Sequence, residues 1–98
     1  MKLYKTTAIG REEAHKYGWN QEQGTKEFLI EQAHQQLLVI FEDKPITTED
    51  AKFCFTLPIP PPDNELKLET RRLFNYILEN FDELLQQLLD KNYIALNK

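Results

Sequence analysis

The sequence is poor in the residues that form disulfides, metal sites or a catalytic centre. It has a single cysteine, Cys54, among 98 residues, which excludes an internal disulfide and a cysteine zinc site. No catalytic or cofactor motif with a specific spacing is present. We therefore expect a protein that is not an enzyme and holds no cofactor.

Long apolar runs are also absent. The longest is LLVIF at residues 37–41, far short of the roughly 20 apolar residues that a membrane span needs. The opening residues, MKLYKTTAIG, lack the apolar segment typical of a signal peptide. The lone thiol fits a reducing compartment. We expect a cytoplasmic protein that does not bind membranes.

Positive charge is not in excess either. The chain has 16 acidic and 12 basic residues, with a net charge of −4. Because phosphate contacts supply most of the affinity for nucleic acids, this composition disfavours nucleic acid as a partner. The charge is uneven, however, since residues 1–19 contain four basic and two acidic side chains, a local balance of +2.

The sequence does contain enough apolar residues for one folded domain over residues 1–98, with 41% hydrophobic and 29% charged residues. Residues 25–43 show apolar side chains at the helical period, with Thr25 as the N-cap, and the helix is expected to end before Pro45. The rival interpretation makes residues 37–41 a buried strand. The helix is favoured because the periodicity continues into this run without a breaker.

Residues 64–92 show the same period over a greater length. The prolines at 60–62 cannot lie inside a helix, and Asn92 is a plausible left-handed terminator. A single helix of this length would span roughly 44 Å at about 1.5 Å per residue. That exceeds the diameter of a compact domain of this size. We therefore expect the helix to bend, to end early or to protrude.

These features predict a mainly α fold, a small helical domain with two principal antiparallel helices (about 25–43 and 64–92). A short N-terminal helix is expected at residues 11–17, and a helical turn after Thr47. A short two-stranded pair of residues 2–9 with 52–57 completes the prediction. Residues 58–63 form a rigid proline-rich connector within the single domain.

The function that we expect is a non-enzymatic protein–protein interaction, as an adaptor, inhibitor or assembly subunit. The two long helices carry more apolar surface than one short neighbour covers, and surplus apolar surface marks an interface. A homodimer is the simplest way to bury it. Another interpretation is that the aromatic residues near the N-terminus cover the open side of the core. The candidate partner-binding residues are Tyr4, Tyr17, Trp19, Phe74, Phe81, Leu85 and Leu88.

An alternative is a small dimeric DNA-binding regulator, with residues 12–29 as a helix-turn-helix. Its phosphate contacts would come from Lys5, Arg11, Lys16 and Lys26. The fit is imperfect, because Gly24 falls where a buried aliphatic residue is needed and the second helix has few basic residues. A helix, a turn and another helix also occur in most small α proteins.

A lesser alternative is a metal-binding bundle. Glu31 and His34 form an E-x-x-H pair one helical turn apart, so both could reach one metal ion, and a dimer would bring two such pairs together. The site also needs a carboxylate from a facing helix, and residues 64–92 offer only apolar side chains on that face. The plainer interpretation places His34 at the edge of the apolar face and Glu31 in water.

Overall fold

Five helices and one pair of short strands form the part of the chain that the structure describes, residues 2–56 and 65–97 of a computed structural model. The predicted mainly α fold is confirmed. The predicted connector at 58–63 lies outside the described residues. No helix in the described ranges is long and apolar enough to cross a membrane. In chain order the elements are β1 (Leu3–Thr6), α1 (Ala8–Ala14), α2 (Lys26–Glu42), α3 (Thr48–Phe53), α4 (Glu65–Glu79), α5 (Phe81–Asp90) and β2 (Ile94–Asn97).

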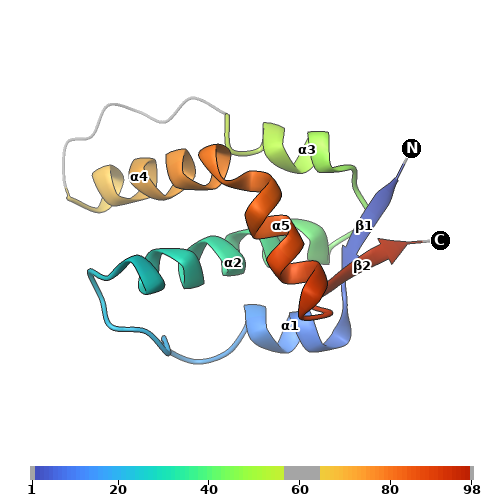
Figure 1. The fold of residues 1–98 in the computed structure, drawn as a ribbon, viewed down its shortest axis with the longest axis horizontal. Helices are drawn as coiled ribbons and strands as arrows, with labels where there is room; N and C mark the ends of the chain where they lie inside the picture. Colours follow the sequence, from blue (N-terminus) through green and yellow to red (C-terminus); the bar gives the residue numbers. More distant parts are fainter. Residues whose placement is uncertain (1, 57–64, 98) are drawn as a thin grey trace.

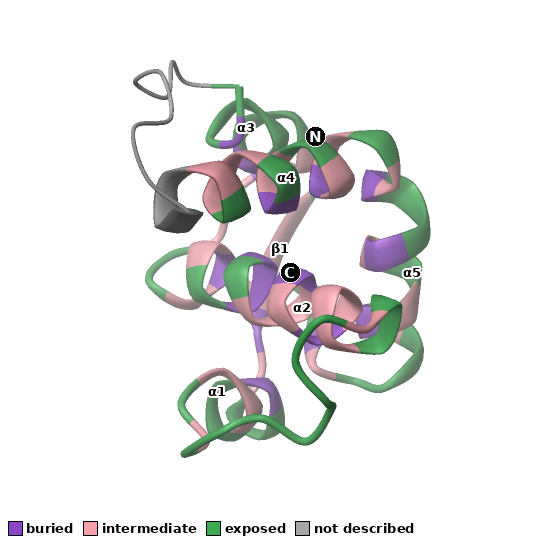
Figure 2. Ribbon diagram, turned by 90° about the vertical axis from the view of Figure 1, so that its left-hand side faces the viewer, coloured by how far each residue is buried: buried purple, intermediate pink, exposed green. Residues whose placement is uncertain are grey.

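Helix α2 is the centre of the fold. Figure 2 looks along it and shows it between α1 on one side and α4 on the other. Its predicted cap is confirmed, since the Thr25 hydroxyl accepts a hydrogen bond from the Phe28 N–H at 3.1 Å. The run at residues 37–41 is helical, not a strand, and Leu37, Leu38 and Phe41 are fully buried there.

The segment predicted as one helix over residues 64–92 is two helices, α4 and α5, separated at Asn80. The backbone of Asn80 leaves the helical region, with φ −122° and ψ 23°. Its side-chain amide donates to the Tyr76 carbonyl at 3.0 Å, a local bond that competes with regular helix. The predicted end is confirmed, since Asn92 has φ +61°.

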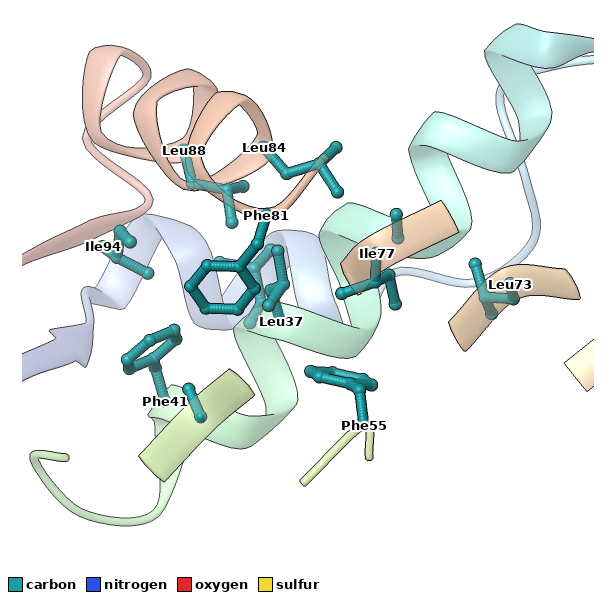
Figure 3. Close-up of a cluster of buried hydrophobic side chains, with 12 residues drawn as sticks. Leu37, Phe41, Phe55, Leu73, Ile77, Phe81, Leu84, Leu88 and Ile94 are labelled. Atoms are coloured by element: carbon teal, nitrogen blue, oxygen red, sulfur yellow. The ribbon is translucent and has the colours of Figure 1, made fainter. Parts of the chain in front are cut away.

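The break at Asn80 turns α5 across α2, so the apolar stripe is covered inside the molecule (Figure 1). Figure 3 shows Phe81, Leu84 and Leu88 gathered with Leu37 and Phe41 of α2. The three side chains of α5 are at most 3% exposed. The surplus apolar surface on which the predicted helix-face dimer depended is therefore largely internal core.

The relative direction of the two principal helices differs from the prediction. Helices α2 and α4 run the same way in Figure 1, not antiparallel. In agreement, Glu69 and Arg72 near the start of α4 lie beside Thr25 and Phe28 at the start of α2. Because α3 lies between these two helices in the chain, they need not run antiparallel.

The predicted strand at residues 2–9 is present as β1, but its partner is β2 and not residues 52–57. The two strands pair antiparallel, from Leu3 opposite Asn97 to Thr6 opposite Ile94. The strand prediction at 52–57 is wrong because α3, which Thr47 caps as expected, continues through Phe53. Phe53, at the end of α3, is exposed, and Phe55, in the turn that follows, is buried.

The N-terminal helix begins earlier than the predicted 11–17, because Thr7 is its cap. The Thr7 hydroxyl accepts from the Gly10 N–H at 3.1 Å and donates to the Asn92 carbonyl at 2.6 Å. Gly10 then lies so close to the C-terminal segment that a Cβ there would be 2.0 Å from the Tyr93 carbonyl oxygen. Both contacts fix α1 against the start of β2.

Candidate functional site

The connection between α1 and α2, residues 15–25, is the most distinctive surface feature, and we call it the 15–25 loop. Residues 17–24 are all exposed (Figure 2). Gly18 and Gly24 have φ of +81° and +91°, a backbone conformation that other residues rarely adopt. An added Cβ would meet nothing within 4 Å at either position, so the backbone angle alone requires glycine there.

A buried carboxylate on α2 holds this exposed loop. Glu31 is only 9% exposed. Its Oε1 accepts hydrogen bonds from the backbone N–H groups of Asn20 at 2.9 Å and Gln21 at 3.1 Å. Its Oε2 accepts one from the Lys16 ammonium at 2.6 Å, and Lys16 also donates to Glu13 at 2.7 Å. We call this set, Glu13, Lys16, Asn20, Gln21 and Glu31, the Glu31 clamp.

The clamp keeps both of its central groups charged. Burial raises the pKa of Glu31, but the hydrogen bonds from Lys16, Gln21 and Asn20 outweigh it and bring the pKa below its ordinary value of 4.5. Burial likewise lowers the pKa of Lys16, and its bonds to Glu13 and Glu31 bring it above the ordinary 10.5. A charged pair removed from water is stable only with such full hydrogen bonding.

Two aromatic side chains project from the clamped loop. Tyr17 is fully exposed and Trp19 is 48% exposed. The Trp19 ring meets the ring of Phe28 on α2 edge to face, with 5.1 Å between the centroids. Trp19 therefore has one side packed on the scaffold and another open to solvent. Aromatic residues in this setting are typical of protein-binding hot spots.

A shallow groove of about 350 Å³ begins next to this pair, between the first turns of α2 and the start of α4. Its apolar lining residues are Phe28 and Leu29. The polar lining residues are Gln23, Thr25, Gln32, Glu69 and Arg72. Because Phe28 belongs both to the groove and to the Trp19 contact, the 15–25 loop and the groove form one continuous surface.

The other predicted partner-binding residues lie elsewhere. Phe81 and Leu88 are buried in the core and offer no surface to a partner in this fold. Phe74 and Leu85 are partly buried against the same core. Tyr4 is also partly buried, with its ring 6.5 Å from that of Phe41, so the interpretation that it covers the core fits best. Of the seven, only Tyr17 and Trp19 are exposed, and both belong to the 15–25 loop.

The basic residues predicted for nucleic-acid binding do not form one surface. Arg11 pairs with Glu42 at 3.3 Å, and Lys16 is held within the Glu31 clamp. Lys26 is exposed at the first turn of α2, and Lys5 is in β1. Residues 15–25 are also much longer than the 3–4-residue turn of a helix-turn-helix. The DNA-binding alternative stays a prediction that this geometry does not favour.

The E-x-x-H pair is divided between two structural roles. Glu31 faces the loop, so the interpretation that it lies in water is wrong. The His34 Nε2 atom is 2.7 Å from Oε1 of Gln87 on α5. Burial lowers the pKa of His34, an effect that the Gln87 bond opposes and the charge of Lys91 reinforces. Within the described ranges, no three His, Cys, Asp or Glu residues are grouped to bind a metal ion.

The role of Glu31 was missed from the sequence, although a signal was present. Glu31 precedes the buried Leu38 by seven residues and follows Phe28 by three, so it lies on the inward face of the same helix. An acidic residue at such a position needs a cationic or N–H partner. The glycines at 18 and 24 mark a loop whose backbone turns sharply enough to supply those N–H groups.

Comparisons of the chain with protein-family models, with curated proteins and with solved structures found no match.

Proposed function

We propose that this is a non-enzymatic protein–protein interaction protein that binds a partner protein through the 15–25 loop and the adjoining groove. The observation that carries the proposal is the Glu31 clamp. A buried carboxylate that accepts from two backbone N–H groups and pairs with Lys16 holds a loop whose residues 17–24 are exposed. Loops that bind are typically displayed in this way on a rigid scaffold.

The physical advantage of a fixed loop lies in the entropy of binding. Ordering flexible loops and side chains on binding costs conformational entropy and weakens the affinity. A loop that is ordered before binding therefore binds more tightly for the same contacts. Tyr17 and Trp19 add large contact area with few rotatable bonds. The polar lining residues of the groove, which include Glu69 and Arg72, supply hydrogen-bonding groups beside the apolar Phe28 and Leu29.

The shifted pKa values have structural causes and do not indicate a catalytic group. Groups with shifted pKa values in a cleft are candidates for catalysis. Here the shifts of Lys16 and Glu31 come from the clamp, and that of His34 comes mainly from burial beside Gln87. Each has a structural partner that accounts for it. We therefore propose a role as an adaptor, an inhibitor or an assembly subunit.

We also propose a cytoplasmic location and self-association. Cys54 is exposed with a free thiol, and an exposed thiol is stable in a reducing compartment. Self-association cannot rely on the apolar stripe of α5, because α2 covers it. A dimer therefore needs another surface.

The binding proposal is tested with paired baits. The wild-type chain and the Tyr17→Ala variant capture partners from cells side by side, and a partner retained only by the wild type is then purified. Isothermal titration follows for the wild type, Tyr17→Ala, Trp19→Ala and the matched control Glu49→Ala, which alters an exposed residue of α3. Each aromatic truncation is expected to weaken binding by at least about 2 kcal/mol, and the control by less than about 0.5 kcal/mol.

The proposal is wrong if both aromatic variants capture and bind the same partners as the wild type with unchanged affinity. Thermal unfolding of each variant provides the folding control. Because the exposed ring of Tyr17 adds little to the core, Tyr17→Ala separates binding from stability.

A further inference from the structure

The outer edge of β2 is the second surface with a definite chemistry. The N–H of Tyr4 donates to the Ile46 carbonyl at 2.9 Å, and the N–H of Ile46 donates to the Tyr4 carbonyl at 3.1 Å. The polar backbone groups of Tyr4 therefore point away from β2. Tyr4 lies opposite Leu96 in the register. In an antiparallel pair, such a position is a non-hydrogen-bonded one, so the N–H and C=O of Leu96 point away from β1.

These groups of Leu96 face the open side of the sheet. The sheet has two strands in the order β1-β2, and no described strand lies beyond β2. The edge of β1, in contrast, is closed by the bridge to Ile46. A row of N–H and C=O groups at an open edge is a ready template for another strand.

The sequence of β2 does not protect this edge. Natural edge strands carry lysine, proline or a bulge that prevents pairing. Residues 94–97, IALN, contain no charge and no proline, and they pair with β1 in continuous register without a bulge. The edge is therefore free to accept an uncharged strand.

The apolar side chains of β2 also extend to its open edge. Ile94 and Leu96 share one face of the strand, because alternate residues point the same way. Ile94 is 1% exposed and belongs to the core, whereas Leu96 is 43% exposed. Leu96 lies opposite Tyr4, which packs on Phe41. Leu96 is thus an exposed apolar side chain at the open edge, opposite a residue that packs on the core.

We propose that β2 pairs antiparallel with β2 of a second copy of this chain, about a twofold axis at Leu96, to give a four-stranded sheet. Each Leu96 N–H donates to the Leu96 carbonyl of the other copy, and the two leucine side chains meet on the core face. Ala95 of each copy lies opposite Asn97 of the other.

The second copy is the favoured occupant for two reasons. Antiparallel pairing about a twofold axis matches donors and acceptors of one strand by symmetry. In addition, two copies of a chain of net charge −4 repel each other most where like charges meet. Residues 94–97 carry no charge, so pairing through β2 avoids this repulsion. The contact is small, so we expect a dimer that dissociates on dilution and not a permanent one.

This surface is separate from the proposed binding loop. In Figure 1 the strands lie at one end of the long axis, with both termini, and the 15–25 loop lies toward the other end. Dimerisation through β2 therefore leaves both copies of the loop open to partners. Failure of the dimer would remove the proposed self-association and leave partner binding by the loop unaffected.

The test is sedimentation equilibrium of the full chain over a dilution series. The wild type is expected to approach twice the monomer mass as concentration rises. Leu96→Lys places two like charges opposite each other in the dimer. Leu96→Pro removes the N–H that points outward, and a strand tolerates proline only at an edge, where that N–H has no partner within the monomer. Each variant is expected to weaken association by at least about tenfold. Val39→Lys, at a residue 48% exposed on α2, is the matched control and is expected to dimerise like the wild type.

Circular dichroism confirms that each variant is folded. If Leu96→Pro unfolds, Leu96→Lys still decides the question, because an exposed lysine is compatible with the monomer. A wild type that stays monomeric throughout, or a folded Leu96→Lys that associates as strongly as the wild type, overturns the proposal.

Discussion

The Nζ atom of Lys16 lies 2.6 Å from Oε2 of Glu31, and this pair joins the start of the 15–25 loop to the second turn of α2. The two side chains are 16% and 10% exposed, so neither is screened like a surface pair. The same carboxylate binds two backbone N–H groups further along the loop. One side chain therefore fixes the loop at two places.

Replacing Glu31 with glutamine should destabilise the protein by about 1.5–3 kcal/mol, since it removes the charge from hydrogen bonds that depend on it. Urea unfolding at neutral pH measures the change. Glu12→Gln, at an exposed position of α1, is the control and should stay within about 0.5 kcal/mol of the wild type. Equal changes in the free energy of unfolding for the two substitutions would show that the Glu31 clamp does not stabilise the protein.

The clamp should also make the protein sensitive to acid. The folded-state pKa of Glu31 is lowered from its ordinary value of 4.5. Its contribution is therefore complete above pH 4.5 and is lost as the pH falls through the folded-state pKa. The difference in unfolding free energy between the wild type and Glu31→Gln should shrink below pH 4.5. A difference that stays constant into strong acid would contradict the charged clamp.

His34 should give a separate loss of stability nearer neutrality. Burial lowers its pKa from the ordinary 6.5, so the folded state favours the neutral ring. The unfolded chain takes up a proton near pH 6.5, and the folded chain does so only at lower pH. The unfolding free energy should therefore fall as the pH drops below 6.5. Thermal unfolding between about pH 8 and 5 tests this, with His34→Gln expected to flatten the profile in that range.

Gly10 should tolerate no larger residue. A Cβ at this position would lie 2.0 Å from the Tyr93 carbonyl oxygen, and backbone cannot yield as a flexible side chain does. Gly10→Ala is expected to cost at least about 1–3 kcal/mol, although alanine favours helix elsewhere. Chemical denaturation provides the measurement, with Glu12→Ala on the same helix as the control. A stabilising effect would mean that α1 is not packed on the C-terminal segment.

Local signals in the sequence predicted local structure well. Thr25 and Thr47 each cap the helix that follows, and Asn92 adopts the left-handed conformation expected of it. These features depend on a few neighbouring residues, so the sequence is sufficient to identify them. The mainly α fold and the strand near the N-terminus followed from the same kind of reasoning, whereas the predicted strand at 52–57 was wrong.

Features that depend on contacts far apart in the chain were not predictable in the same way. The length of the 64–92 segment indicates a bend, but Asn80 lies within a continuous apolar period, so the position of the break is not predictable. Similarly, β1 pairs with β2 at the other end of the chain, and no turn signal links them. Predicting the Glu31 clamp requires both the local helical period, which places Glu31 on the inner face of α2, and the path of the 15–25 loop, which brings Lys16 to it.

The most direct test of the account is amide hydrogen exchange at Asn20 and Gln21, the two loop residues whose N–H groups donate to Glu31. Both lie in an exposed loop, so nothing but the clamp should slow them. We predict exchange at least about tenfold slower than in an unstructured peptide, and loss of this protection in Glu31→Gln. Exchange of both amides at unprotected rates in the wild type would contradict the claim that this is a loop held in place for binding.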